Sequence, residues 1–132
     1  MLKKTIKYTD YNGVEREEDF YFNLSKAELT QMQMEVEGGL EAKIQKIIQA
    51  KDTQSLMAMF KELILKSYGK KSDDGRMFEK SKEISREFEC SAAFDELYME
   101  LATNDKAAAD FVNGIIPASL QAAVKKEVEA KN

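Results

Sequence analysis

The chain has 132 residues, a net charge of −4 from 24 acidic and 20 basic side chains, and no histidine. This length predicts one domain, 1–132, with its own hydrophobic core. The acidic balance argues against a nucleic-acid-binding protein, which needs a basic surface, and the absence of histidine removes the commonest general base and metal ligand. A single cysteine, Cys90, excludes an internal disulfide and a cysteine-based zinc site. No stretch is apolar for long enough to span a membrane.

Residues 2–22 predict a β-hairpin. Apolar and charged residues alternate on both sides of Asn12-Gly13, a strong turn signal. A two-residue loop at that point would place Ile6 opposite an acidic residue, whereas pairing Ile6 with Phe20 gives one apolar and one charged face. We therefore expect a loop of about three residues, 12–14, and an outer face on which lysines lie opposite acids. An isolated hairpin is only marginally stable, so this one must pack on helices or pair with another chain.

Residues 56–67 predict a central helix around which the rest of the chain is arranged. Its buried stripe has helical spacing and consists of Leu56, Met59, Phe60, Leu63, Ile64 and Ser67. Met57 and Leu65 widen this stripe, so the helix should be packed on two sides. Asp52 is the expected N-cap, and the helix should stop at 68–69, where Gly69 can adopt a left-handed conformation. An exposed, charged loop, residues 70–76, should follow.

The remainder of residues 25–130 predicts short helices. Ser25 and Glu28 have the spacing of a capping box, and Ser81 and Asn104 are expected N-caps of two later helices. Further helices are expected at 40–50, from about 91, and at 118–130. The predicted fold class is therefore α+β, an N-terminal β-hairpin followed by a mostly α-helical bundle of six or seven short helices.

No arrangement of side chains predicts catalysis, a cofactor or a metal site. If Gly75 took the sixth position of a calcium-binding EF-hand loop, Lys70 and Ser81 would stand where acidic ligands are required, so the acidic residues before Gly75 indicate a turn. The acids at 15–19 alternate between strand faces and do not converge as an acid–base pair. Cys90 lacks a histidine to activate it. These observations favour a binding protein over an enzyme.

The chain has seven methionines. Five of them lie on or beside the first and the central helix: Met32, Met34, Met57, Met59 and Met77. The flexible, polarisable methionine side chain suits a binding surface that adapts to its partner, although filling of the core is its commoner role. Because residues two apart point in different directions on a helix, Met32 and Met34 cannot both face inward. One of the two is therefore expected at the surface.

Three segments spread over most of the chain resemble one protein family. They are KKTIKYTDYNGVEREEDFYFNLSKAEL (3–29), ILKSYGKKSDDGRMF (64–78) and FVNGIIPASL (111–120). They resemble the tail assembly chaperones of long-tailed, siphovirus-type phages and prophages of Gram-positive bacteria. The resemblance implies a non-enzymatic protein of the host cytoplasm that binds the tape measure protein, helps recruit tail tube subunits and is absent from the mature virion. In many such phages a frameshift adds a second domain, and a chain ending at Asn132 would correspond to the short form.

Contact with these partners is expected at the loop and at an exposed part of the methionine-bearing helices. The residues concerned are Met32, Met34, Met57, Met59, Tyr68, Lys70, Lys71, Asp73, Asp74, Arg76 and Met77. Two alternatives remain open: a structural virion component, such as a tail terminator or head-to-tail connector, and a small phage regulatory binding protein. Self-association through a free hairpin edge is also open, whereas no nucleic acid or membrane partner is expected.

Overall fold

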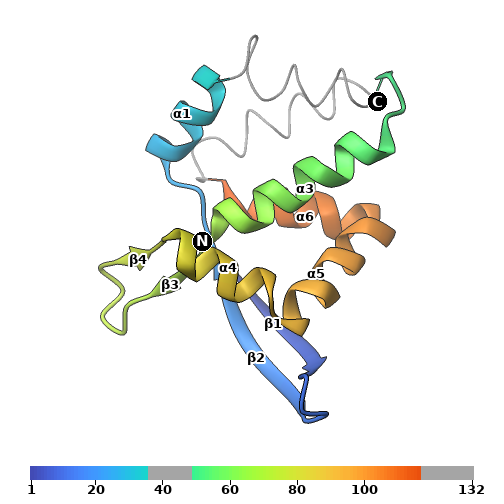
Figure 1. The fold of residues 1–132 in the computed structure, drawn as a ribbon. Helices are drawn as coiled ribbons and strands as arrows, with labels where there is room; N and C mark the ends of the chain where they lie inside the picture. The colour runs from blue at the N-terminus through green and yellow to red at the C-terminus, as the bar shows by residue number, and fades with distance from the viewer. Residues whose placement is uncertain (36–48, 117–132) are drawn as a thin grey trace.

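The computed structural model describes residues 1–35 and 49–116, and these residues form an α+β fold of four strands and five helices (Figure 1). The chain begins with two antiparallel strands and continues with helices, between which a second, smaller pair of strands is inserted. The bounds of these elements, in chain order, are as follows: β1 (Leu2–Thr9), β2 (Glu15–Phe22), α1 (Lys26–Glu35), α3 (Thr53–Ser67), β3 (Tyr68–Lys71), β4 (Phe78–Glu79), α4 (Lys82–Glu89), α5 (Ala92–Thr103) and α6 (Asp105–Ile115).

The number of helices differs from the six or seven that the sequence predicts. Five helices occur in the described residues. The helices expected at 40–50 and 118–130 lie almost wholly outside those residues. Within residues 49–116 the expected helices are all present, and the predicted helix after Ser81 has the bounds Lys82–Glu89.

The expected helix caps are confirmed. Asp52, Ser81 and Asn104 each accept a hydrogen bond from the backbone N–H three residues later, at 3.0–3.1 Å. Ser25 and Glu28 form the reciprocal pair of a capping box, because each accepts a hydrogen bond from the other's backbone N–H. Such caps satisfy N–H groups that have no partner inside the helix, each contributing about 1 kcal/mol.

The β1–β2 hairpin is present, but its predicted register is wrong by two residues. Ile6 lies opposite Glu18 rather than Phe20. The loop is residues 11–13 instead of 12–14, because Asp10 begins the turn: its carboxylate accepts hydrogen bonds from the N–H groups of residues 12 and 14, and Gly13 supplies a φ of 79°. A shift of two residues leaves every side chain on the same face, so the alternation of apolar and polar residues could not distinguish the two registers.

A second hairpin replaces the loop expected after the central helix. β3 follows α3 directly and pairs with β2 through Tyr21–Gly69 and Phe22–Tyr68, so the four strands form an antiparallel sheet in the order β1-β2-β3-β4. The expected left-handed cap at Gly69 is wrong, because Gly69 lies in β3 and is not among the residues with positive φ. A Cβ at Gly69 would lie 2.7 Å from a Phe78 ring carbon and 2.8 Å from the Glu79 carbonyl oxygen. Glycine is therefore required here for the close approach of β4.

Aromatic side chains join the sheet to the helices. Phe22 of β2 is completely buried, and its ring centroid lies 5.3 Å from that of Phe111 in α6 and 5.6 Å from that of Phe88 in α4. Tyr68 of β3 stacks on Phe88 at 4.4 Å. The central helix adds its buried stripe to the same core through Met59, Leu63, Ile64 and Ser67, which confirms the stripe predicted for it. The second hairpin is therefore held at its base and extends away from the helices, whereas β1 of the first hairpin packs on α5 (Figure 1).

Helix α1 is attached to the rest of the described structure by an ion pair. The Nζ atom of Lys80, which follows β4, lies 2.7 Å from one oxygen of Glu28 and 2.8 Å from the other, and it also donates to the Asn23 carbonyl oxygen at 2.6 Å. Partial burial alone would raise the pKa of Glu28, but hydrogen bonds from Lys80 and Ser25 outweigh that effect and lower it below its usual value of 4.5. The pair therefore stabilises the fold with Glu28 ionised.

We predict that Gly69→Ala destabilises the protein by about 2–3 kcal/mol, because a methyl group there meets backbone and a packed ring. Gly114→Ala is the matched control: its Cβ would meet the flexible Leu2 side chain, and alanine favours the helix, so the change should stay within about 1 kcal/mol. Urea denaturation followed by circular dichroism measures both free energies of unfolding. Equal values for the two variants would contradict the role assigned to Gly69.

We predict that Lys80→Met lowers the free energy of unfolding by about 1 kcal/mol at pH 7. Because the folded-state pKa of Glu28 is depressed, this stabilisation is present above the unfolded value near 4.5 and is lost as the pH falls through the lower folded value. The free energies of unfolding of wild type and variant should therefore converge as the pH falls through the folded-state pKa of Glu28. Lys66→Met, which removes an exposed i,i+4 pair with Glu62, is the control and should cost less than about 0.5 kcal/mol. If the free energies of unfolding of wild type and Lys80→Met differ by the same amount from pH 7 to pH 3, the stabilisation does not depend on ionised Glu28.

Candidate partner-binding surface

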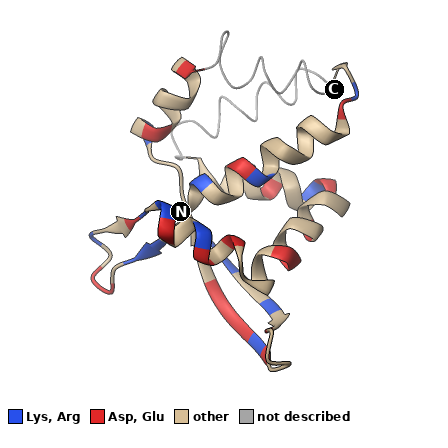
Figure 2. Cartoon of the chain, viewed as in Figure 1, with Lys and Arg blue, Asp and Glu red and all other residues tan. Residues whose placement is uncertain are grey.

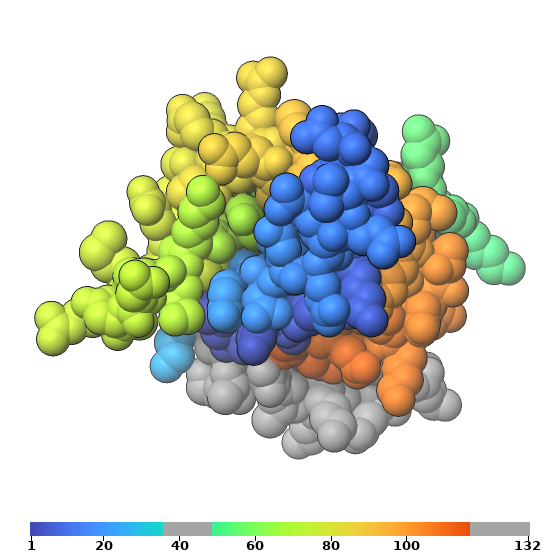
Figure 3. Space-filling model, turned by 90° about the horizontal axis from the view of Figure 1, so that it is seen from below, coloured from blue at the N-terminus to red at the C-terminus, as the bar shows by residue number. Residues whose placement is uncertain are grey.

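The β3–β4 hairpin presents a preorganised turn at the edge of the molecule, where it projects away from the other elements (Figure 3). The Ser72 N–H donates to the Met77 carbonyl oxygen at 2.9 Å, and the Asp74 carboxylate accepts from the Ser72 hydroxyl at 2.7 Å and from the Arg76 N–H at 3.0 Å. The hydrogen bonds from the Arg76 N–H and the Ser72 hydroxyl lower the pKa of Asp74. Gly75 completes the turn with a φ of 76°. The predicted turn at 73–75 is thus confirmed, within a hairpin instead of an irregular loop.

Side chains at the tip of this hairpin are exposed, whereas those at its base contact neighbouring elements. At the tip, Asp73, Arg76 and Met77 are exposed, and Met77 has 64% of its surface accessible. At the base, Lys70 pairs with Glu87 of α4 at 3.1 Å, and the Lys71 Nζ lies 5.7 Å from the centroid of the Tyr21 ring. The base of the hairpin is therefore fixed to α4 and β2, while the tip offers both charges and one long apolar side chain.

The structure separates the methionines proposed for binding into two groups. Met32 is 8% exposed and Met34 81%, which confirms that only one of the two faces inward. Met59 is buried and Met57 is half-buried. Among the proposed residues, Met34 and Met77 are the methionines with large accessible surfaces.

Three of the residues that the sequence proposes for partner contact lie in the core instead. Met32, Met59 and Tyr68 belong to the cluster of buried side chains, and burial raises the pKa of the Tyr68 hydroxyl. Apolar packing therefore accounts for all three, and a partner that leaves this fold intact does not reach them. Lys70, Lys71, Asp73, Asp74, Arg76 and Met77 remain together on one hairpin, whereas Met34 lies on α1 and Met57 on α3.

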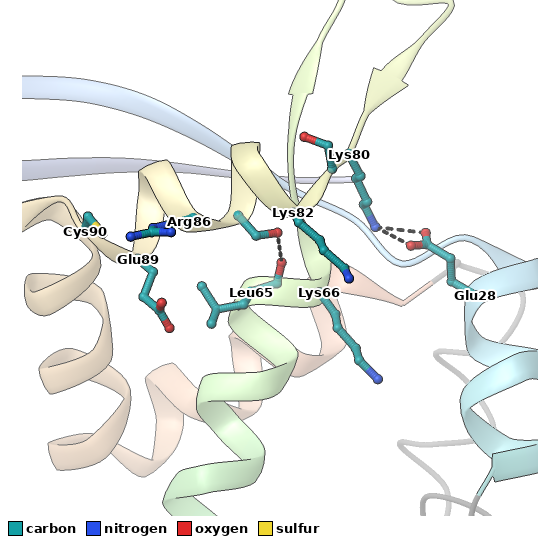
Figure 4. Close-up of a pocket in the computed structure, with 10 residues that line it drawn as sticks. Glu28, Leu65, Lys66, Lys80, Lys82, Arg86, Glu89 and Cys90 are labelled. Atoms are coloured by element: carbon teal, nitrogen blue, oxygen red, sulfur yellow. Dashed lines mark hydrogen bonds and ion pairs between the residues drawn. The ribbon is translucent and has the colours of Figure 1, made fainter.

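A groove of about 760 Å³ lies between α3 and α4 and extends towards α1 (Figure 4). Leu65 and Ser85 lie where the two helices meet, and the Ser85 hydroxyl donates to the Leu65 carbonyl oxygen at 3.2 Å. Lys66, Lys82 and Arg86 line the groove. Lys82 and Arg86 are four residues apart on α4, so their side chains occupy the same helix face and repel each other.

Ion pairs close the two ends of the groove. Lys80 and Glu28 pair at the end near α1 (Figure 4). Glu89, at the other end, pairs with Lys61 at 3.4 Å. Lys66 is paired with Glu62. Within residues 1–35 and 49–116, Lys82 and Arg86 have no acidic partner, so the groove carries uncompensated positive charge in a chain of net charge −4.

The groove was not identified from the sequence, because its lining residues come from α1, α3, α4 and the segment that joins β4 to α4. The one local signal was the like-charged pair Lys82 and Arg86 at i,i+4 spacing on a predicted helix. In the described part of the chain, no three acidic or cysteine side chains come together as a metal site. No helix among these residues has the length and apolar character needed to cross a membrane.

A comparison with known protein families identifies the family to which this chain belongs. A family model described as phage tail assembly chaperone matches residues 1–132. Searches of curated protein sequences and of solved structures gave no match. The match extends over the three segments that carry the sequence resemblance and over the hairpin and groove described above. The chain therefore belongs to the phage tail assembly chaperone family.

Proposed function

We propose that this tail assembly chaperone binds the tape measure protein, keeps it soluble and helps to recruit tail tube subunits around it, without catalysing a reaction. The observation that carries the proposal is the family match over residues 1–132. We further propose that it acts in the cytoplasm of a bacterium infected by, or carrying, a siphovirus-type phage of Gram-positive hosts, and that it is absent from the mature virion.

The tip of the β3–β4 hairpin is the contact surface that we propose for the tape measure protein. Its backbone is fixed by the hydrogen bonds of Ser72 and Asp74, so little conformational entropy is lost there on binding. Met77 and Arg76 are exposed on this rigid frame. A flexible methionine beside a guanidinium group can adapt to a long helical client whose apolar positions vary along its length.

The exposed methionine of α1 extends this surface in our proposal. Met34 has 81% of its surface accessible, more than any other large apolar residue of the described chain except Tyr11 at 83%. Leu29 and Met32 bury the opposite side of the same helix, and the Lys80–Glu28 pair fixes its first turn. A helix held in this way keeps Met34 pointing outward, which supports a role in contact with an apolar partner.

We predict that replacing Met77 and Arg76 together by serine weakens binding of the tape measure protein about tenfold or more, which corresponds to the loss of one interface hot spot. Coexpression of the two proteins followed by affinity capture, and the soluble fraction of the tape measure protein, provide the measurement. Met99→Ser is the matched control, because Met99 is 51% exposed on α5 and lies outside the proposed surface.

Two outcomes would count against the proposal. Failure of the wild-type protein to capture or solubilise the tape measure protein would exclude that client. An equal loss of binding in the Met99→Ser control would show that the hairpin tip has no special role. Mass spectrometry of purified phage particles tests the proposed absence from the mature virion. A structural virion component would be detected there, and a transient chaperone would not.

A further inference from the structure

The β1–β2 hairpin has an acidic surface that the fold leaves open. β3 pairs with β2 only at Tyr21 and Phe22, so in the described structure residues 15–19 of β2 have no strand partner on that side. All five of these residues are exposed, and four of them are acids, interrupted only by Arg16 along β2 (Figure 2). β2 is therefore an acidic strand that pairs with β1 on one edge and, over residues 15–19, has no strand partner on its other edge in the described structure.

Two of these acids point in the same direction and form no ion pair within the described residues. Phe20 and Phe22 face the helices, and side chains alternate along a strand, so Glu15 and Glu17 lie together on the opposite face. Asp19 on that face is already engaged by Thr5 at 2.6 Å and by Lys3 at 3.6 Å. Within the described residues, Glu15 and Glu17 have no such contact within ion-pair distance.

The spacing of these two acids matches that of the two unpaired cations in the groove. Residues two apart on a strand are separated by about 6.6 Å, and residues four apart on a helix, such as Lys82 and Arg86, by about 6 Å. A groove of about 760 Å³ has room for side chains of this size.

We propose that the groove between α3 and α4 takes the β1–β2 hairpin of a second copy of this chain, with Glu15 and Glu17 paired to Lys82 and Arg86. Because the hairpin and the groove are different surfaces, the contact either closes reciprocally as a dimer or continues head to tail. The net charge of −4 on each copy opposes association, so the contact depends on this local complementarity and weakens as salt screens it.

Charge reversal with rescue tests the proposal on the full-length protein. Light scattering coupled to size-exclusion chromatography, and sedimentation equilibrium from micromolar to millimolar protein, give the mass and the association constant. At low salt the wild type should reach at least twice the monomer mass. Glu15→Lys with Glu17→Lys, and separately Lys82→Glu with Arg86→Glu, should each lower the association constant at least about tenfold.

Rescue distinguishes a direct contact from misfolding. An equimolar mixture of the two double variants places lysines against glutamates in both directions, and it should recover the wild-type association. The matched controls reverse equal charge elsewhere: Asp95→Lys with Asp110→Lys, and Lys26→Glu with Lys106→Glu, all at exposed positions. These controls should associate like the wild type, and circular dichroism should show all variants folded.

Three results would overturn the proposal: a wild type that stays monomeric across the concentration range, charge reversals that act no more strongly than their controls, or a mixture that fails to associate. None of these results depends on binding of the tape measure protein. Loss of tape measure binding in the Lys82→Glu, Arg86→Glu variant of a monomeric protein would instead assign the groove to that client.

Discussion

The contact of Phe22 with rings from two helices is the interaction on which the rest of the described structure depends. Phe22 is fully buried, and its neighbours Phe88 and Phe111 belong to α4 and α6. Because Phe22 also pairs with Tyr68 across the sheet, one residue connects the first hairpin, the second hairpin and the helices. Burial of aromatic rings of this size contributes several kcal/mol. The second hairpin can extend away from the helices because its base is fixed at this point.

Much of the helical part of the fold could be predicted from the sequence, because its signals are local. Ser81 and Asn104 mark helix starts through one side-chain hydrogen bond each, and the stripe on the central helix follows from its spacing alone. The register of the first hairpin could not be predicted in the same way. A shift of two residues preserves the face of every side chain, and the deciding interaction, the Asp10 carboxylate with the turn N–H groups, has no counterpart in the apolar pattern.

The second hairpin and the groove escaped prediction for a different reason. The strands Tyr68–Lys71 and Phe78–Glu79 are short, and their sequence between residues 70 and 77 is polar and charged, so composition indicates a loop. Their pairing becomes favourable only when Gly69 lets β4 approach and β2 offers its edge. The groove likewise depends on bringing α3 and α4 together. Of the residues proposed for partner contact, six are exposed on the second hairpin. The spacing of the central helix already placed Met59 in its buried stripe, whereas no local signal showed that Tyr68 is a core residue.

The direct passage from α3 into β3 has a mechanical consequence. Ser67 is the last residue of the helix and Tyr68 the first of the strand, so no linker separates them. A force on the hairpin tip therefore acts directly on Tyr68, whose ring stacks on Phe88 at 4.4 Å. Any change in the direction of the hairpin relative to the central helix has to be accommodated by the backbone at this junction and by that stacked pair of rings.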